Sequence, residues 1–225
     1  AEDRGQRVPQ HVRDDREAIV LGAVGRLRRE LRVPLALEQR PAHVLPLEHA
    51  SQPLNLVRRQ KERVLTVKGC VLSLDHILDV GQAHLPDIDA ALGERLAPDM
   101  FPLGTQIAFA CNQPLGFSQW CAGQPIELLD PGVTGIATAR DYIRDTRARV
   151  QAIHADDARL DESKRTGLGP GMYCETPARL YVSDYLLPNF YFHIAMTYAI
   201  LRKLGVPVGK ADYMRFLMPH VRQAS

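Results

Sequence analysis

The chain has 225 residues, 45% hydrophobic and 24% charged, which is typical of a globular protein and excludes collagen-like, coiled-coil and strongly disordered chains. Its net charge of +2 excludes the strong basic field that a nucleic-acid partner requires. The sequence has no apolar run of 18 residues, so it predicts no membrane-spanning helix and no membrane partner.

The first 66 residues differ from the rest of the chain. They carry 12 Arg and 1 Lys against 9 acidic residues, together with five prolines that break long elements. Short helices are predicted over 16–32 and 54–66, but all of the chain's aromatic residues follow residue 100. We expect residues 1–66 to form an irregular, poorly ordered extension. There are two interpretations of this stretch. It is sequence outside the domain, such as an upstream extension or a start codon assigned too early, or it is a basic arm that binds acidic partners.

Helical periodicity begins near residue 67. Apolar residues at helical spacing predict the first long helix; its stripe consists of Val71, Leu74, Ile77, Leu78, Gly81 and Leu85. A short helix is expected over 87–95. Another is expected over 102–113, and it continues after Pro114 over 117–122.

The second half of the chain predicts two further helices with a long loop between them. One covers about 132–154, because Asp130 and Pro131 have the order of a helix cap and a first-turn proline. The other covers about 181–204 and is closed by Gly205. In the loop over 156–179, the run GLGPG lacks the strand and helix that flank a phosphate loop. It therefore predicts a tight turn between two short strands.

These elements favour an all-α fold over 67–220: an antiparallel four-helix bundle with a short hairpin before its last helix. The sequence contains no GxSxG, HExxH or HxxxH motif. Its four cysteines form no CxxC pair. This argues against a disulfide framework or a zinc knuckle and favours reduced thiols in a cytoplasm.

Two histidines are candidates for a site in the bundle interior. His193 lies on the flank of the last helix's apolar stripe, on the same side as Asn189 four residues earlier. His84 lies on the flank of the first stripe. Polar flanks facing a bundle interior are where such folds build metal and ligand sites. The alternative is that both histidines bond to loops or cap helices, since zinc and iron sites usually take three protein ligands.

Asp99 and Asn112 are further site candidates. Asp99 precedes the helix predicted from residue 102, so we expect it to cap that helix rather than to act in catalysis. Asn112 follows Cys111, which we assign to packing. Aromatic side chains occupy more than one face of the last helix, so the surplus beyond the core is available to line a ligand pocket or a homodimer face.

Two motifs resemble a bacterial family. RLAPDMFPL at 95–103 and LPNFYFH at 187–193 are similar to segments of the domain of unknown function 1993 family, whose fold is related to the DinB-like (DinB/YfiT) helical bundles. The resemblance covers about residues 69–218. It implies an up-down-down-up four-helix bundle, often dimeric, in a superfamily that includes proteins regarded as three-histidine metalloenzymes and thiol-dependent transferases.

The resemblance also bears on the site. His84 is similar to a histidine that members often carry before the first motif, and His193 closes the second motif. The superfamily's HxxxH spacing is missing, since Asn189 and Thr197 flank His193 at four residues. Asp184 stands where relatives carry another histidine. The implied cofactor is a divalent metal, Zn, Ni or Fe.

Two functions remain open. The first is a small-molecule enzyme in which His84 and His193 bind a metal or act as acid and base, supported by Asn112 and Asn189. The second is a non-catalytic bundle that binds a ligand or dimerises through its aromatic face. Ring nitrogens more than roughly 8 Å apart cannot share one ion at bond lengths of about 2.1 Å.

Overall fold

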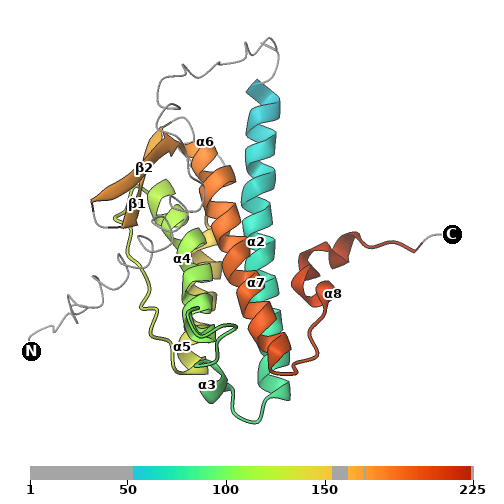
Figure 1. The fold of residues 1–225 in the computed structure, drawn as a ribbon. Helices are drawn as coiled ribbons and strands as arrows, with labels where there is room; N and C mark the ends of the chain where they lie inside the picture. The colour runs from blue at the N-terminus through green and yellow to red at the C-terminus, as the bar shows by residue number, and fades with distance from the viewer. Residues whose placement is uncertain (1–52, 154–161, 170, 224–225) are drawn as a thin grey trace, which may run out of the picture. The chain divides into compact units, whose positions relative to one another are not determined.

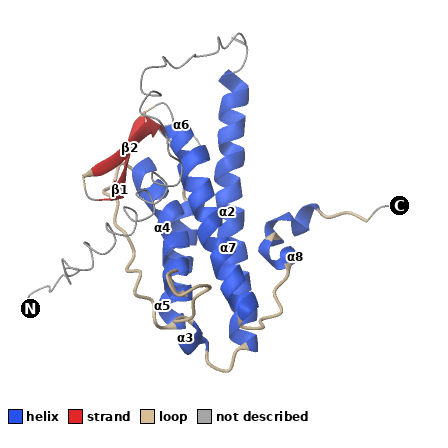
Figure 2. Ribbon diagram, viewed as in Figure 1, coloured by secondary structure: helices blue, strands red, loops and turns tan. Residues whose placement is uncertain are grey.

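The computed structural model describes residues 53–153, 162–169 and 171–223. This part of the chain is mostly helical (Figures 1 and 2). The longer helices are α2 (Pro53–His84), α4 (Leu103–Cys121), α5 (Ile136–Gln151) and α7 (Leu187–Lys203). The shorter elements are α3 (Ile88–Ala91), β1 (Ser163–Gly169), β2 (Met172–Pro177), α6 (Ala178–Leu180), the π-helical turn η3 (Tyr181–Leu186), α8 (Lys210–Tyr213) and the 3-10 turn η4 (Arg215–His220).

The described residues separate into two compact units, a β-hairpin over 162–177 and a helical unit made of the rest. In the hairpin, β1 and β2 pair antiparallel, with Ser163 opposite Pro177 and Gly167 opposite Tyr173. Gly171 has φ +70° in the connecting turn, a conformation that glycine adopts without steric cost. The predicted turn between two short strands is therefore confirmed.

Side-chain contacts fix the helix directions in the helical unit. Asp75 on α2 pairs with Arg140 on α5 at 2.8 Å, whereas Lys68 donates to the carbonyl of Gln151 at 3.3 Å. Helices α2 and α5 are therefore antiparallel. Figure 1 shows α7 running in the same direction as α2, and α4 running in the opposite direction.

The core lies between these helices and continues along their length. Its largest fully buried side chains include Leu74, Ile77, Leu103, Ile107, Ile143, Phe190, Ile194 and Ile200. A second cluster gathers Phe117 on α4, Val150 on α5 and Tyr181 on η3. The first predicted stripe is thus correct, since Val71, Leu74, Ile77 and Leu78 are all buried.

Helix boundaries differ from the sequence expectation in two places. The helices expected over 54–66 and from residue 67 form the single helix α2, so the expected boundary at residue 66 lies inside a helix. Helix α4 runs through Pro114 without interruption. The helix expected over 16–32 lies outside the described residues, as does the rest of 1–52.

Helix α5 begins at Ile136 rather than near residue 132, and Asp130 is not its cap. Asp130 accepts a bond from the amide of Gly132 at 2.9 Å, which closes a turn in the loop. The amide of Ile136 instead donates to Asp89 of α3 at 2.6 Å. A carboxylate from another helix therefore satisfies one of the orphan donors at this helix start.

The last long helix is confirmed but has an irregular start. The amide of Leu187 donates to Val182, five residues earlier, which defines the π-helical turn η3. Pro188 follows directly. In a regular α-helix its ring would collide with the carbonyl of Asp184, and the wider turn relieves that conflict. Gly205, with φ +84°, ends the helix as expected.

Among the described residues, no helix combines the length and the apolar character that crossing a membrane requires.

Candidate functional site

His193 lies in the middle of α7 and is 8% exposed. Its Nδ1 atom lies 2.8 Å from Oε1 of Gln106 on α4. The amide nitrogen of Gln106 donates to the carbonyl of Phe101 at 3.3 Å, which turns Oε1 toward the histidine. Since Oε1 can only accept, Nδ1 carries the proton and Nε2 keeps its lone pair.

Aromatic rings surround this histidine. Phe109 and Phe192 contact the imidazole edge to face, with ring centroids 5.2 and 5.3 Å away, and Phe101 packs against Phe109. Burial lowers the pKa of His193 from 6.5 to about 4, because an imidazolium there would lose its hydration. The ring is therefore neutral at pH 7.

The Nε2 atom of His193 has no hydrogen-bond partner within the described part of the chain. It is also not among the fully buried polar atoms that lack a partner. It therefore retains contact with solvent and is able to accept a proton or bind a ligand. The sequence placed His193 on the flank of an apolar stripe, but it did not reveal Gln106 as its partner.

His84 lies elsewhere. It is the exposed last residue of α2. A Cβ on Gly81 would lie 3.2 Å from the side chain of Leu201, so these two residues are level on the parallel helices α2 and α7. His84 follows Gly81 by three residues, and His193 precedes Leu201 by eight residues. At a rise of 1.5 Å per residue, the two histidines are about 16 Å apart along the helix axes. The structure does not bring these two histidines together.

This placement argues against one metal ion shared by His84 and His193. The described residues also contain no group of three His, Cys, Asp or Glu side chains that fits a metal ion. The donors that the structure describes therefore do not match the three-ligand site that the family resemblance implies.

No hydrogen bond joins the other candidates to His193 among the described residues. Asn112 accepts a bond from the amide of Leu129 at 2.8 Å and so holds a loop. Asn189 is half-buried on α7. Asp99 is exposed, and no side chain caps α4, whose N-cap residue is Pro102. The expectation that Asp99 caps this helix is wrong, because Pro102, three residues later, is the N-cap residue and no side chain bonds to the helix start.

The first sequence motif instead shapes the turn before α4. Arg95 donates to the carbonyl of Met100 at 2.6 Å, and the amide of Leu103 donates to the backbone carbonyl of Glu94 at 2.8 Å. Lys203 at the end of α7 donates to the carbonyl of Arg95 at 2.6 Å. These contacts tie the motif to the end of the last helix, so the motif has a structural role in this turn.

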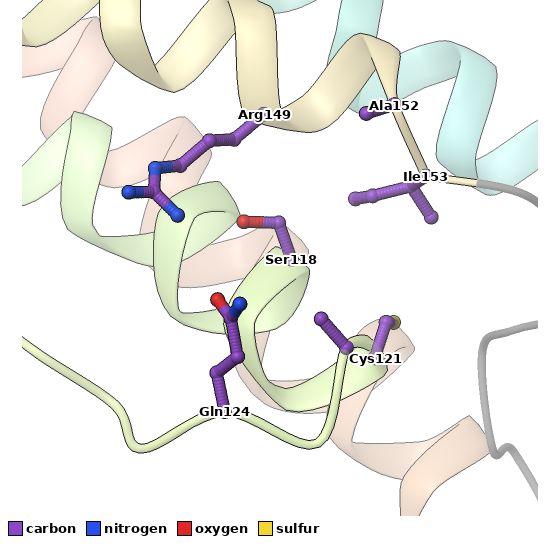
Figure 3. A pocket seen from close by; sticks show the side chains of 7 residues that line it. Ser118, Cys121, Gln124, Arg149, Ala152 and Ile153 are labelled. Atoms are coloured by element: carbon purple, nitrogen blue, oxygen red, sulfur yellow. The ribbon is translucent and has the colours of Figure 1, made fainter.

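A groove of about 540 Å³ lies where α4 and α5 end (Figure 3). Arg149, Ser118 and Gln124 form its polar end, while Ala152 and Ile153 face them across the groove. Cys121 and Ala122 complete the lining. Sequence analysis missed this site, because its residues come from two helix ends and a loop and show no motif.

The thiols divide by environment. Burial raises the pKa of Cys111 to about 12, which outweighs the opposing effect of Thr146 beside it. This thiol is therefore inert, in line with its assignment to packing. Cys121 is half-buried at the groove. Burial also raises the pKa of Tyr181, whose ring stacks on Phe117 near the same end of the unit.

Comparison with known proteins decides the family. The family model described as a domain of unknown function (DUF1993) matches residues 61–214. The chain belongs to the DUF1993 family. The match begins within α2, several residues earlier than the motifs suggested.

A solved structure supports the relation of DUF1993 to DinB-like folds. It is the crystal structure of a DinB family member protein from Shewanella denitrificans, which is 26% identical to this chain with a TM-score of 0.64. The alignment covers 72% of this chain and 96% of that one. No curated protein matches significantly. The resemblance deduced from the two motifs is thus confirmed.

Proposed function

We propose that this DUF1993 chain is a four-helix bundle of DinB type that binds a small organic ligand in the groove at the ends of α4 and α5. The observation that carries the proposal is the groove itself. Its volume of about 540 Å³ falls within the range of small-molecule sites, which combine apolar walls with a few convergent polar groups.

The surroundings support a preformed site. Beside the groove, Phe117 stacks on Trp120 and on Tyr181. Gln119 accepts a bond from the amide of Glu127 at 3.2 Å and so holds the loop after α4. Walls fixed by ring stacking and side-chain bonds lose little conformational entropy when a ligand binds.

A fragment screen tests this function. Trp120 is the only tryptophan of the chain and precedes the groove residue Cys121, so its fluorescence reports on local binding. We expect hits in ligand-detected NMR that shift this fluorescence and are lost in Ala152→Phe, which fills the groove. The matched control is Ala137→Phe, at an exposed alanine of the same helix. Hits that survive Ala152→Phe would place the ligand elsewhere.

A second candidate function is supported by the geometry of His193. A neutral imidazole with its Nδ1 proton fixed by Gln106 offers Nε2 as a general base or as one ligand of a metal. We propose this role as the enzymatic alternative. Elemental analysis of metal-supplemented protein and of His193→Gln tests the metal form, since a stoichiometric ion that persists in the variant would exclude His193 as a ligand.

Assembly and compartment are further proposals. Phe192 on α7 is 51% exposed, which supports a homodimer through the aromatic face. Light scattering tests the homodimer: the wild type should be a dimer and Phe192→Ser a monomer. A monomeric wild type would contradict the proposal. Cys111 and Cys174 form no disulfide within the described part of the chain, which supports a cytoplasmic protein.

A further inference from the structure

Arg149 differs from the other arginines near it on α5. Arg140 pairs with Asp75 and Asp79 at 2.8 Å. The remaining two also face carboxylates; they are Arg144 with Asp141 and Asp145, and Arg147 with Asp75. Arg149 alone of these has no ion-pair partner within the described part of the chain. Its charge is available at the groove.

The polar end of the groove is set up for an anion. Figure 3 shows the guanidinium of Arg149 near the hydroxyl of Ser118, with the amide of Gln124 facing the same space. The Ser118 hydroxyl donates to the carbonyl of Leu115 at 2.7 Å, so the available donors are Arg149 and Gln124. Among the described residues that line the groove there is no Asp or Glu to neutralise the guanidinium.

The opposite end of the groove is apolar. Ala152 and Ile153 follow the last turn of α5, and Cys121 lies opposite them at the end of α4 (Figure 3). Ala122 also lines the groove. An occupant therefore meets a cation at one end and hydrocarbon at the other. Guanidinium groups bind carboxylates with two parallel hydrogen bonds, which are stronger than neutral ones.

We infer that the ligand of this groove is an organic carboxylate, with its carboxylate on Arg149 and its apolar body against Ala152 and Ile153. The inference rests on the proposed ligand-binding function and adds the chemical class. A chain of a few methylene groups fills such an apolar end, because each buried CH₂ contributes about 0.8 kcal/mol.

The test compares octanoate with octanamide, which has the same chain length and no charge. Binding is measured by calorimetry and Trp120 fluorescence for wild type, Arg149→Gln and Arg144→Gln. The last variant is the control, since it removes the same charge from an exposed arginine of α5 outside the groove. We expect octanoate to bind wild type and Arg144→Gln alike, and Arg149→Gln about tenfold or more weakly. Octanamide should not distinguish the three proteins.

Two results overturn the inference. In the first, octanoate and octanamide bind with the same affinity, and the Arg149→Gln variant binds both as the wild type does. The groove would then bind apolar ligands whether or not they carry a carboxylate, and the proposed ligand-binding function would stand. Octanoate bound equally by Arg149→Gln and Ala152→Phe would place the anion elsewhere. If neither compound binds and the fragment screen yields no groove ligand, the proposed function fails as well.

Discussion

The imidazole of His193 and the side-chain amide of Gln106 meet at 2.8 Å inside the helical unit and join α7 to the first turn of α4. Because Phe101 fixes the orientation of the amide, the amide in turn fixes the tautomer of the histidine. These two hydrogen bonds together determine which ring nitrogen of His193 is available for chemistry. ¹⁵N chemical shifts of His193 at pH 7 should show a protonated Nδ1 and an unprotonated Nε2.

The stability of the protein should fall on acidification below pH 6.5. The folded pKa of His193 is lowered to about 4, so the unfolded chain binds this proton more readily. The contribution of neutral, buried His193 to the free energy of unfolding is fully present above pH 6.5 and is lost as the pH falls toward 4. Linkage gives a loss of about 2 kcal/mol at pH 5. Urea unfolding between pH 5 and 8 should show a shallower pH dependence for His193→Gln than for the wild type.

Replacing Gln106 by leucine should destabilise the fold by about 1–3 kcal/mol, because the buried Nδ1–H of His193 then lacks an acceptor. The matched control is Gln113→Leu, the same change at a half-buried position of α4, where no hydrogen bond of this kind is lost. Thermal and urea unfolding measure both. Equal losses in the two variants would show that the contact with His193 contributes nothing specific.

Gly104→Ala should be severely destabilising. A Cβ at this position would overlap the backbone carbonyl oxygen of Val133, so α4 would have to move away from the loop before α5. Overpacking of this kind costs typically 1–3 kcal/mol or more. Gly93→Ala is the comparison, since its nearest heavy atom would lie at 3.5 Å, and it should retain wild-type stability in thermal unfolding.

Asp89→Ala should cost about 1 kcal/mol, which is typical for the loss of a side-chain partner at a helix start. Its carboxylate accepts the amide of Ile136 at 2.6 Å across two helices. Asp99→Ala removes an exposed carboxylate that does not cap α4, and we expect almost no change there. Hydrogen exchange of the Ile136 amide should accelerate only in Asp89→Ala. A similar rate in both variants would contradict the assigned role.

Deleting residues 1–52, which precede α2, should leave the helical unit folded, whereas deletion to residue 66 also removes the start of α2 and of the family match. The first buried core side chain that the structure describes is Val71, and the family match extends only to residue 61. Circular dichroism melting of chains that start at residues 53 and 67 measures the effect. A large loss of melting temperature in the chain that starts at 53 would show that the upstream residues belong to the domain.

Local patterns in the sequence correctly predicted much of the fold. The stripe from Val71 to Leu78 is buried, Gly205 ends the last helix and Gly171 closes the hairpin turn. Such features depend on side-chain period and on φ preferences, which neighbouring residues encode. Pro114 was misleading because a proline within a helix is tolerated where packing on both sides holds the helix together, as it does for this buried residue of α4.

The sequence by itself indicated the helical class through the spacing of its apolar residues, and it indicated the family through two motifs that resemble it. It also placed His193 on the flank of an apolar stripe. Only the tertiary structure decided which groups meet. Gln106 faces His193, Asp89 reaches Ile136, and His84 lies far from His193. Arg149 lines a groove to which the described residues contribute no carboxylate. These relationships depend on how helices far apart in sequence align when their apolar faces pack, and no local pattern records that alignment.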